Sequence, residues 1–167
     1  MAQSSQGYEH MVSNAAKELS DPLSEIVLDA RAHGRYEPDG PTFESDLNAC
    51  FRYTGADPEP RGLPSGHMPY SFSLPFSSFL QKNSGHHSGA TFTTFLPPDE
   101  LRRKLEDAVG AEYVRSILEG QRRVTTTCGS GMTAGILWLG LKLINEKAPV
   151  ALYDEVCCTL VIVWTIC

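Results

Sequence analysis

One stretch constrains this chain more than any other, residues 123–135, which read RVTTTCGSGMTAG. A β-branched run of valine and threonines ends at Cys128, a glycine-rich turn follows, and an apolar run opens at Ile136. The first run predicts a buried strand, and the last predicts a helix packed on a sheet. Cys128 is therefore expected at the carboxyl end of a strand, where open α/β sheets bind their ligands.

The loop after Cys128 predicts an anion-binding cradle. Gly129 and Gly131 allow successive backbone N–H groups to turn toward one point. The positive end of the following helix dipole favours the thiolate form of the cysteine. We interpret the stretch as a nucleophilic cysteine inside an anion cradle; the alternative is a buried structural cysteine.

The remaining chain alternates helical patterns with short apolar runs. We expect helices over residues 8–19, 97–109 and 111–118, and strands over 26–28, 71–74 and 150–153. A helical turn is expected from Phe76, and residues 82–90 are expected to form a Gly/Ser/His loop. This alternation predicts the α/β class with a mostly parallel sheet.

Composition narrows the class of function. A length of 167 residues with 41% hydrophobic residues fits one globular domain with a core. The net charge of -6 argues against a nucleic-acid binder, and no apolar stretch is long enough to cross a bilayer. Five cysteines, an odd number without a regular framework, favour a reducing compartment. We therefore expect a cytoplasmic or mitochondrial location.

The cysteine loop, CGSGMTA at residues 128–134, resembles the active-site loop of the rhodanese superfamily in its 3-mercaptopyruvate sulfurtransferase form. Thiosulfate-preferring members carry basic residues directly after the cysteine, whereas Gly129 and Ser130 stand here, which favours 3-mercaptopyruvate as the donor. Other pieces of the family pattern follow in the family's order, and together they cover most of residues 26–155. These pieces are DAR at 29–31, GRY at 34–36, PEPR at 58–61, SGHMP at 65–69 and LPF at 74–76.

The resemblance implies a rhodanese-like three-layer fold with a mostly parallel central sheet flanked by helices. We expect a polar segment and helix over residues 1–20, the catalytic domain over 21–155 and an aberrant apolar tail over 156–167. Two tandem domains are usual in this family, and the second one carries the cysteine. This chain resembles that second domain alone, so we expect the first domain to be absent from it.

The resemblance also implies a double-displacement mechanism. The Cys128 thiolate takes sulfur from the donor, pyruvate leaves, and a thiol, thioredoxin or cyanide accepts the sulfur from the persulfide. The N–H groups of residues 129–133 stabilise the persulfide, and Ser130 helps relay a proton to the departing enolate. The implied partners are a small-molecule donor and a thiol acceptor, with no cofactor, metal, nucleic acid or membrane.

Two arginines match the substrate arginines of the family. Arg35 and Arg61 carry guanidinium forks, which suit a carboxylate beside a carbonyl; the alternative is two solvated surface arginines. Arg31 is expected to pair with Asp29 or Glu59, and His67 to anchor a turn. The assigned site residues are Cys128 and Ser130 as catalytic, Arg35, Arg61, Gly129, Gly131, Met132 and Thr133 as substrate-binding, and Asp29, Arg31 and His67 as structural support.

Other interpretations of the motifs are weaker. The glycines of residues 129–134 also fit a dinucleotide fingerprint, with Asp154 as the ribose-binding acid, but that fingerprint normally opens a nucleotide domain. A cysteine phosphatase requires arginine six residues after the cysteine, where Ala134 stands. His86 and His87 suggest a metal, but no third ligand of matching spacing is evident. A non-catalytic sulfur carrier or an inactive fragment remains the alternative to an enzyme.

Two segments depart from the family pattern. Residues 36–52 separate Gly34-Arg35 from the PEPR motif, and Arg-Tyr occurs at both borders of this insertion. Codons for Arg35 to Glu37 and for Val156 to Cys158 can contain intron donor sequences, and codons for Phe51-Arg52 can contain an acceptor. We hypothesise that residues 36–52 and 156–167 are retained intron read as protein, which sequencing of the mature transcript tests.

Overall fold

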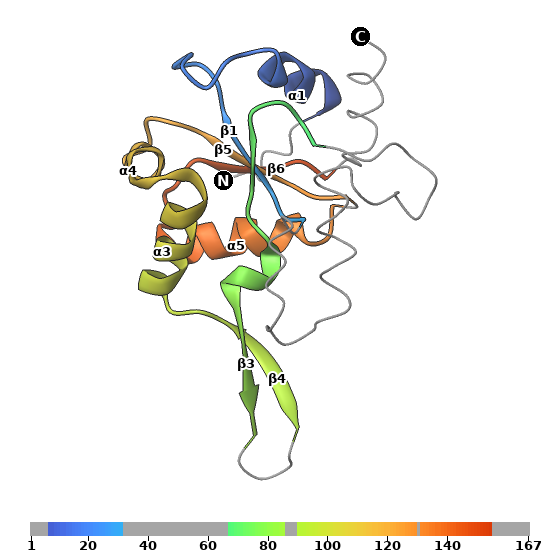
Figure 1. Ribbon diagram of the computed structural model, residues 1–167, viewed down its shortest axis with the longest axis vertical. Coiled ribbons are helices and arrows are strands. Elements are labelled where there is room, and N and C mark those ends of the chain that lie inside the picture. Colours follow the sequence, from blue (N-terminus) through green and yellow to red (C-terminus); the bar gives the residue numbers. More distant parts are fainter. Residues whose placement is uncertain (1–6, 32–66, 86–89, 130, 155–167) are drawn as a thin grey trace, which may run out of the picture.

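A four-stranded parallel sheet in the order β2-β1-β5-β6 forms the centre of the computed structural model, which describes residues 7–31, 67–85, 90–129 and 131–154 (Figure 1). Register pairs join β1 to β5 from Ile26↔Val124 to Asp29↔Thr127, so both strands end at one edge. Both are buried along their whole length, as parallel strands covered on two faces must be. The strands are β1 (Ile26–Asp29), β2 (Ser71–Ser73), β5 (Val124–Thr127) and β6 (Val150–Leu152).

Helices cover both faces of this sheet and make three layers. Successive side chains of a strand point to opposite faces, so Ile26 and Leu28 pack with α3, α4 and α5, whereas Val27 packs with Met11 of α1. The predicted parallel sheet flanked by helices is confirmed. The helices are α1 (Tyr8–Ala15), the 3-10 helix η1 (Phe76–Phe79), α3 (Pro98–Val109), α4 (Ala111–Leu118) and α5 (Ala134–Ile144).

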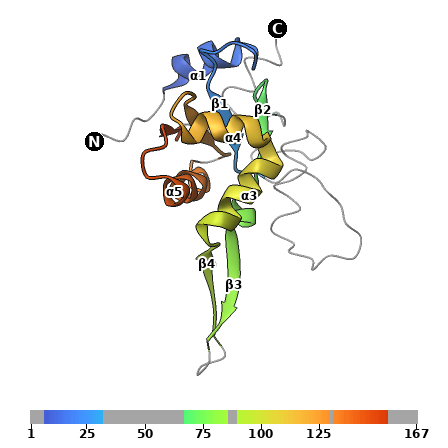
Figure 2. The same cartoon turned by 90° about the vertical axis from the view of Figure 1, so that its left-hand side faces the viewer.

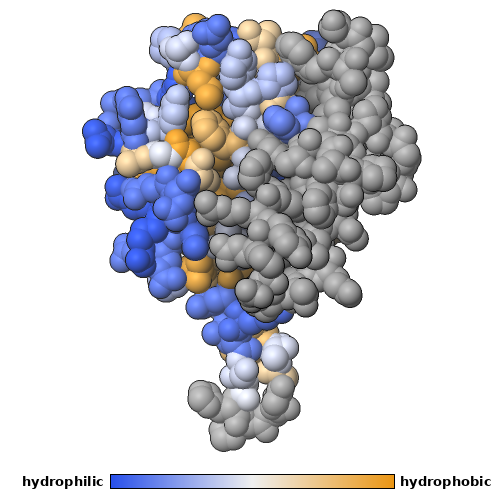
Figure 3. All heavy atoms as spheres, in the orientation of Figure 1, coloured by the Kyte–Doolittle hydropathy of each residue, from blue (hydrophilic) through white to orange (hydrophobic). Residues whose placement is uncertain are grey.

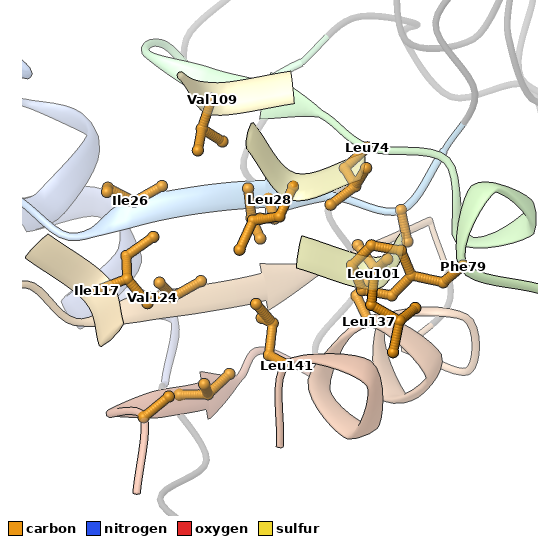
Figure 4. Packing of buried hydrophobic residues seen from close by; sticks show 14 of the residues in the cluster. Ile26, Leu28, Leu74, Phe79, Leu101, Val109, Ile117, Val124, Leu137 and Leu141 are labelled. Carbon is orange, nitrogen blue, oxygen red and sulfur yellow. The ribbon is translucent and has the colours of Figure 1, made fainter. Parts of the chain in front are cut away.

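The larger core lies between the sheet and α3, α4 and α5. Leu101 of α3, Leu137 of α5 and Phe79 of η1 converge there, all fully buried (Figure 4). Gly140 lets α5 approach η1, because a Cβ at this position would lie 2.3 Å from Cδ2 of Phe79. The opposite side of α3 carries three consecutive exposed basic residues at 102–104, and this outer surface is hydrophilic (Figure 3).

The first helix is shorter than predicted. It ends at Ala15 rather than at residue 19, although the apolar spacing continues to Leu19. Local helix bonds are replaced by long-range ones: Nη2 of Arg122 donates to the Leu19 carbonyl at 2.7 Å, and the Asn14 side chain donates to the Glu25 carbonyl at 3.1 Å. Tertiary hydrogen bonds therefore set this helix end.

The loop predicted over residues 82–90 is wrong in part, because a hairpin occupies its start. β3 (Leu80–Ser84) pairs antiparallel with β4 (Thr91–Phe95), and the hairpin extends away from the body (Figures 1 and 2). Most of its side chains are exposed on both faces, so the apolar alternation of a half-buried strand is missing from β3. Residues 86–89, with the histidine pair, lie outside the described residues.

The other predicted elements are confirmed within one to two residues. Gly110 ends α3 with φ of 92°, and α4 follows at once. No helix in the described ranges is long and apolar enough to cross a membrane. The predicted insertion at 36–52 and tail at 156–167 lie outside the described residues.

Candidate functional site

Cys128 stands directly after β5, at the carboxyl edge of the sheet. Its side chain is 1% exposed and belongs to the same buried cluster as Ala134 and Leu137, in the first turn of α5. The thiol is free. The sequence therefore places the sulfur between the end of a central strand and the beginning of a helix, where the helix dipole favours an anion.

The loop that links Cys128 to α5 requires glycine at one position. Gly131 has φ of 82°, which only glycine adopts without strain. A Cβ there would lie 2.8 Å from the carbonyl oxygen of Asp154, a backbone atom that cannot move aside easily. The loop is therefore held by close backbone packing against the end of β6.

Backbone donors remain available at the start of α5. The first bonds of this turn run from Gly135 N to the Met132 carbonyl at 3.3 Å and from Ile136 N to the Thr133 carbonyl at 3.1 Å. Within the described ranges, the N–H groups of Met132 and Thr133 donate to no protein acceptor. Such unpaired donors at a helix beginning are what an anion needs.

The side chains around these donors differ in exposure. Met132 is 82% exposed, so it lies at the open rim of the loop. Thr133 adopts helical angles, and its hydroxyl makes no capping hydrogen bond at the N-terminus of α5. Ala134, six residues after Cys128, is buried.

A buried ion pair flanks the cysteine loop. Arg31 donates to the Asp29 carboxylate through Nη2 at 2.5 Å and through Nε at 3.0 Å, and its backbone N–H donates to Oδ1 at 3.0 Å. Ala30, between them, donates to the Thr127 carbonyl at 2.8 Å. Of the two acids that the sequence offered to Arg31, Asp29 is bound in the described structure, and Glu59 lies outside the described residues.

Several assigned residues cannot be placed. Ser130, Arg35 and Arg61 lie outside the described residues, so their predicted roles stay predictions. His67 is exposed and precedes the turn that leads into β2. The described residues contain no group of three His, Cys, Asp or Glu side chains that could hold a metal.

Two features of the site were not predicted. The hydroxyl of Thr127 is buried and has no hydrogen-bond partner in the described structure, although it adjoins Cys128. Asp154 was considered only as a ribose-binding acid, yet its carbonyl packs on Gly131. The contact of Asp154 with the cysteine loop could have been inferred from the position of Asp154 after the strand that follows α5, because neighbouring parallel strands end at the same edge of a sheet.

The known proteins whose sequences are similar to this chain are sulfurtransferases. The chain is 34% identical over 110 residues to thiosulfate/3-mercaptopyruvate sulfurtransferase 2 of Arabidopsis thaliana, covering 65% of this chain and 27% of that protein. It is 31% identical to 3-mercaptopyruvate sulfurtransferase of Homo sapiens over 65% of this chain and 31% of that protein. The chain is 33% identical to thiosulfate sulfurtransferase of Bos taurus, over 65% of this chain and 31% of that protein. The matched part thus spans less than a third of each relative, and no family model matches the chain.

Solved structures share the fold. The Tum1 protein from Saccharomyces cerevisiae superposes with a TM-score of 0.58 at 23% identity, covering 95% of this chain and 43% of that one. The 3-mercaptopyruvate sulfurtransferase from Leishmania major gives 0.50 at 19% identity, covering 82% and 29%. These matches confirm the rhodanese-like fold, and the sequence comparisons show that the chain is similar to the thiosulfate/3-mercaptopyruvate sulfurtransferases.

Proposed function

We propose that this chain moves a sulfane sulfur from 3-mercaptopyruvate or thiosulfate to a thiol or cyanide through a persulfide on Cys128. The observation that carries the proposal is the position of the thiol. It lies at the end of a central strand, beside a glycine-rich loop whose donors at Met132 and Thr133 lack acceptors among the described residues. Relatives with sulfurtransferase names support the reaction class.

The first half-reaction is a displacement at sulfur. The Cys128 thiolate attacks the donor sulfur, the carbon–sulfur bond of 3-mercaptopyruvate breaks, and the electron pair leaves on the enolate of pyruvate. The enolate then takes a proton, which we assign to a relay through Ser130. Donors preorganised at the loop stabilise the charge on the persulfide that remains.

Donor choice rests on the residues around the cysteine. Arg35 and Arg61 are proposed to bind the carboxylate and carbonyl of the donor as charge-assisted pairs. Gly129 and Ser130 add no positive charge after the cysteine, and we therefore rank 3-mercaptopyruvate above thiosulfate. A thiol acceptor such as thioredoxin would take the sulfur in the second half-reaction.

Intact mass spectrometry tests the first half-reaction. The purified chain is exposed to 3-mercaptopyruvate or to thiosulfate, beside Cys128→Ser as the matched control. One added sulfur atom with 3-mercaptopyruvate, absent from the control, is the expected result. A folded chain that takes up sulfur from neither donor would have the fold without the sulfurtransferase activity. A chain that takes up sulfur but passes it to no acceptor would be a carrier.

A further inference from the structure

The β3–β4 hairpin is a separate two-stranded sheet that projects from the body in both views of the molecule (Figures 1 and 2). The side chains of residues 91–94 are exposed, and Phe95 at the base of the hairpin is partly buried. Phe92 is 53% exposed, so a large aromatic side chain faces solvent on the projecting part. A hairpin with two open edges is marginally stable by itself and gains stability from a further strand.

The backbone of β4 has an inner edge toward β3 and an outer edge, and two hydrogen bonds show which groups lie on each. Toward the tip, the Gly85 N–H donates to the Ala90 carbonyl at 2.8 Å. Toward the body, the Leu96 N–H donates to the Phe79 carbonyl at 2.9 Å. Bonded pairs alternate with non-bonded pairs along an antiparallel ladder, so every second residue of β4 bonds to β3. Counted from both bonds through the register, the residues whose N–H and C=O groups point to the outer edge are Thr91, Thr93 and Phe95.

The two outer edges of the hairpin differ in how they are protected. Proteins protect open edges with charged side chains, lysine above all, or with proline. β3 carries Lys82 on its outer edge, whereas β4 consists of threonine and phenylalanine, without charge or proline and with high β propensity. Pro97, which has no N–H, ends the outer edge of β4 on the side of the body. The edge open to another strand is therefore residues 91–95.

We propose that β4 pairs antiparallel with β4 of a second copy of this chain, so that two hairpins form one four-stranded sheet about a two-fold axis at Thr93. In this register Thr93 exchanges both backbone bonds with the partner's Thr93, and Thr91 does so with the partner's Phe95. All three outward-facing residues are thus satisfied at once. The remaining pair is Phe92 opposite the partner's Thr94. Every cross-strand pair joins threonine to phenylalanine or to threonine, and pairs of these kinds stabilise sheets.

Charge and shape favour a second copy as the occupant. The chain has a net charge of -6, so two copies repel each other where their bodies approach. The described part of the hairpin carries no acid and one base, Lys82. Because β4 runs from the tip toward the body, antiparallel pairing directs the two bodies to opposite ends of the shared sheet. Five paired residues span roughly 17 Å, about twice the Debye length at physiological salt, so the repulsion between the bodies is screened.

Sedimentation equilibrium of the full chain over a range of concentrations tests the pairing, and the wild type should be a reversible dimer. Thr93→Pro removes an N–H that faces outward, so it leaves the β3–β4 ladder intact. The dimer then lacks two hydrogen bonds, which should raise its dissociation constant about thirtyfold. Lys82→Pro is the matched control, because it makes the same change at the register partner of Thr93 on the other edge. It should leave the dissociation constant unchanged.

A cysteine on the axis tests the register independently of the proline variants. In Thr93→Cys the two Cα atoms should lie about 5.5 Å apart across the axis, within the range of about 4.4–6.8 Å that a disulfide needs. Mild oxidation should therefore yield a peptide that links residue 93 of one copy to residue 93 of the other. Thr94→Cys is the control, because its two Cα atoms are diagonal neighbours about 7–8 Å apart and should not be linked.

Several results would overturn the proposal. A wild-type chain that stays monomeric up to about a millimolar concentration would do so. A dimer weakened equally by Thr93→Pro and Lys82→Pro, or by neither, would place the contact elsewhere. If Thr93→Pro does not fold, as judged by circular dichroism, the cysteine variants decide: equal linking at residues 93 and 94, or linking at neither, overturns the register. The proposal does not depend on the proposed function, since the paired edge contains no residue assigned to sulfur transfer.

Discussion

The two edges of the central sheet use polar groups in opposite ways. At the amino edge the Glu25 carboxylate is surrounded by protein partners: Thr125 donates to it at 2.6 Å, Arg123 at 3.3 Å, and Nε2 of His10 lies 2.9 Å away. The Glu25 backbone is bound by Asn14 on both sides, through its N–H at 2.7 Å and its carbonyl at 3.1 Å. These bonds fasten α1 to the sheet.

At the carboxyl edge the charges are paired but the loop donors are not. Asp29 and Arg31 satisfy each other in the interior, whereas the N–H groups of Met132 and Thr133 lack protein acceptors in the described part of the chain. The amino edge has its own buried unpaired donor among the described residues, Nη1 of Arg122, but that guanidinium lies over the Tyr113 ring at 5.4 Å. The contrast teaches that unpaired donors mark a site only where they border a nucleophile and a helix beginning.

The largest stability effect should come from breaking the buried pair at the carboxyl edge. Arg31→Met leaves the fully buried Asp29 carboxylate without its cation, which should lower the free energy of unfolding by about 3–5 kcal/mol. Urea unfolding followed by circular dichroism measures the loss. The Asp29→Asn/Arg31→Met double variant removes both charges and should recover much of it. A single-variant loss of less than about 1 kcal/mol, typical of exposed pairs, would contradict the buried pairing.

A smaller and more local effect is expected from the glycine of the cysteine loop. Gly131→Ala forces a Cβ into a left-handed backbone and against the Asp154 carbonyl, at 2.8 Å. Gly120→Ala is the matched control, because Gly120 has a similar φ of 77° but nothing within 4 Å of the added atom. The control should lose about 1–2 kcal/mol from backbone strain alone. Gly131→Ala should lower the free energy of unfolding by about 1–3 kcal/mol more than the control does, because the added Cβ overpacks the loop. It should also abolish sulfur uptake by Cys128.

Equal losses in the two glycine variants would show that contact with Asp154 does not hold the loop. Thermal unfolding gives the stability, and intact mass after 3-mercaptopyruvate gives the uptake. Because the two substitutions share the same backbone cost, the difference between them reports only the packing between the cysteine loop and β6.

The strands and helices near Cys128 were predictable because their signals are local. The β-branched run at 124–127 and the apolar run from Ile136 each match one secondary structure. The strand is buried throughout, whereas the helix buries Leu137 and Leu141 and leaves Leu139 and Leu143 exposed. The end of α1 and the β3–β4 hairpin were not predictable in this way. Arg122 reaches the Leu19 carbonyl across more than a hundred residues, and an exposed hairpin has no buried face to impose alternation.

The same distinction applies to the site. Cys128 and the loop glycines could be found from sequence, because a motif of consecutive residues defines them. The pairing of Arg31 with Asp29 was predicted as one of two options, since only a fold decides which acid is near. The contact between Gly131 and Asp154 joins two strands' ends, and no pattern within either segment encodes it.

The smallest loss of stability is expected from a substitution at the amino edge. Together with unchanged sulfur uptake, it would confirm that the charges at this edge have only a structural role. Glu25→Gln keeps an oxygen for the Thr125 hydroxyl but removes the charge facing Arg123 and His10. Arg123 and His10 are 47% and 41% exposed, so solvent screens both pairs and the loss should be about 1 kcal/mol. Added salt should shrink that loss further, because it screens what remains. Sulfur uptake by Cys128 should not change, since the Glu25 network lies at the opposite edge of the sheet. If Glu25→Gln instead abolished uptake in a folded chain, the division between a structural edge and a reactive edge would be wrong.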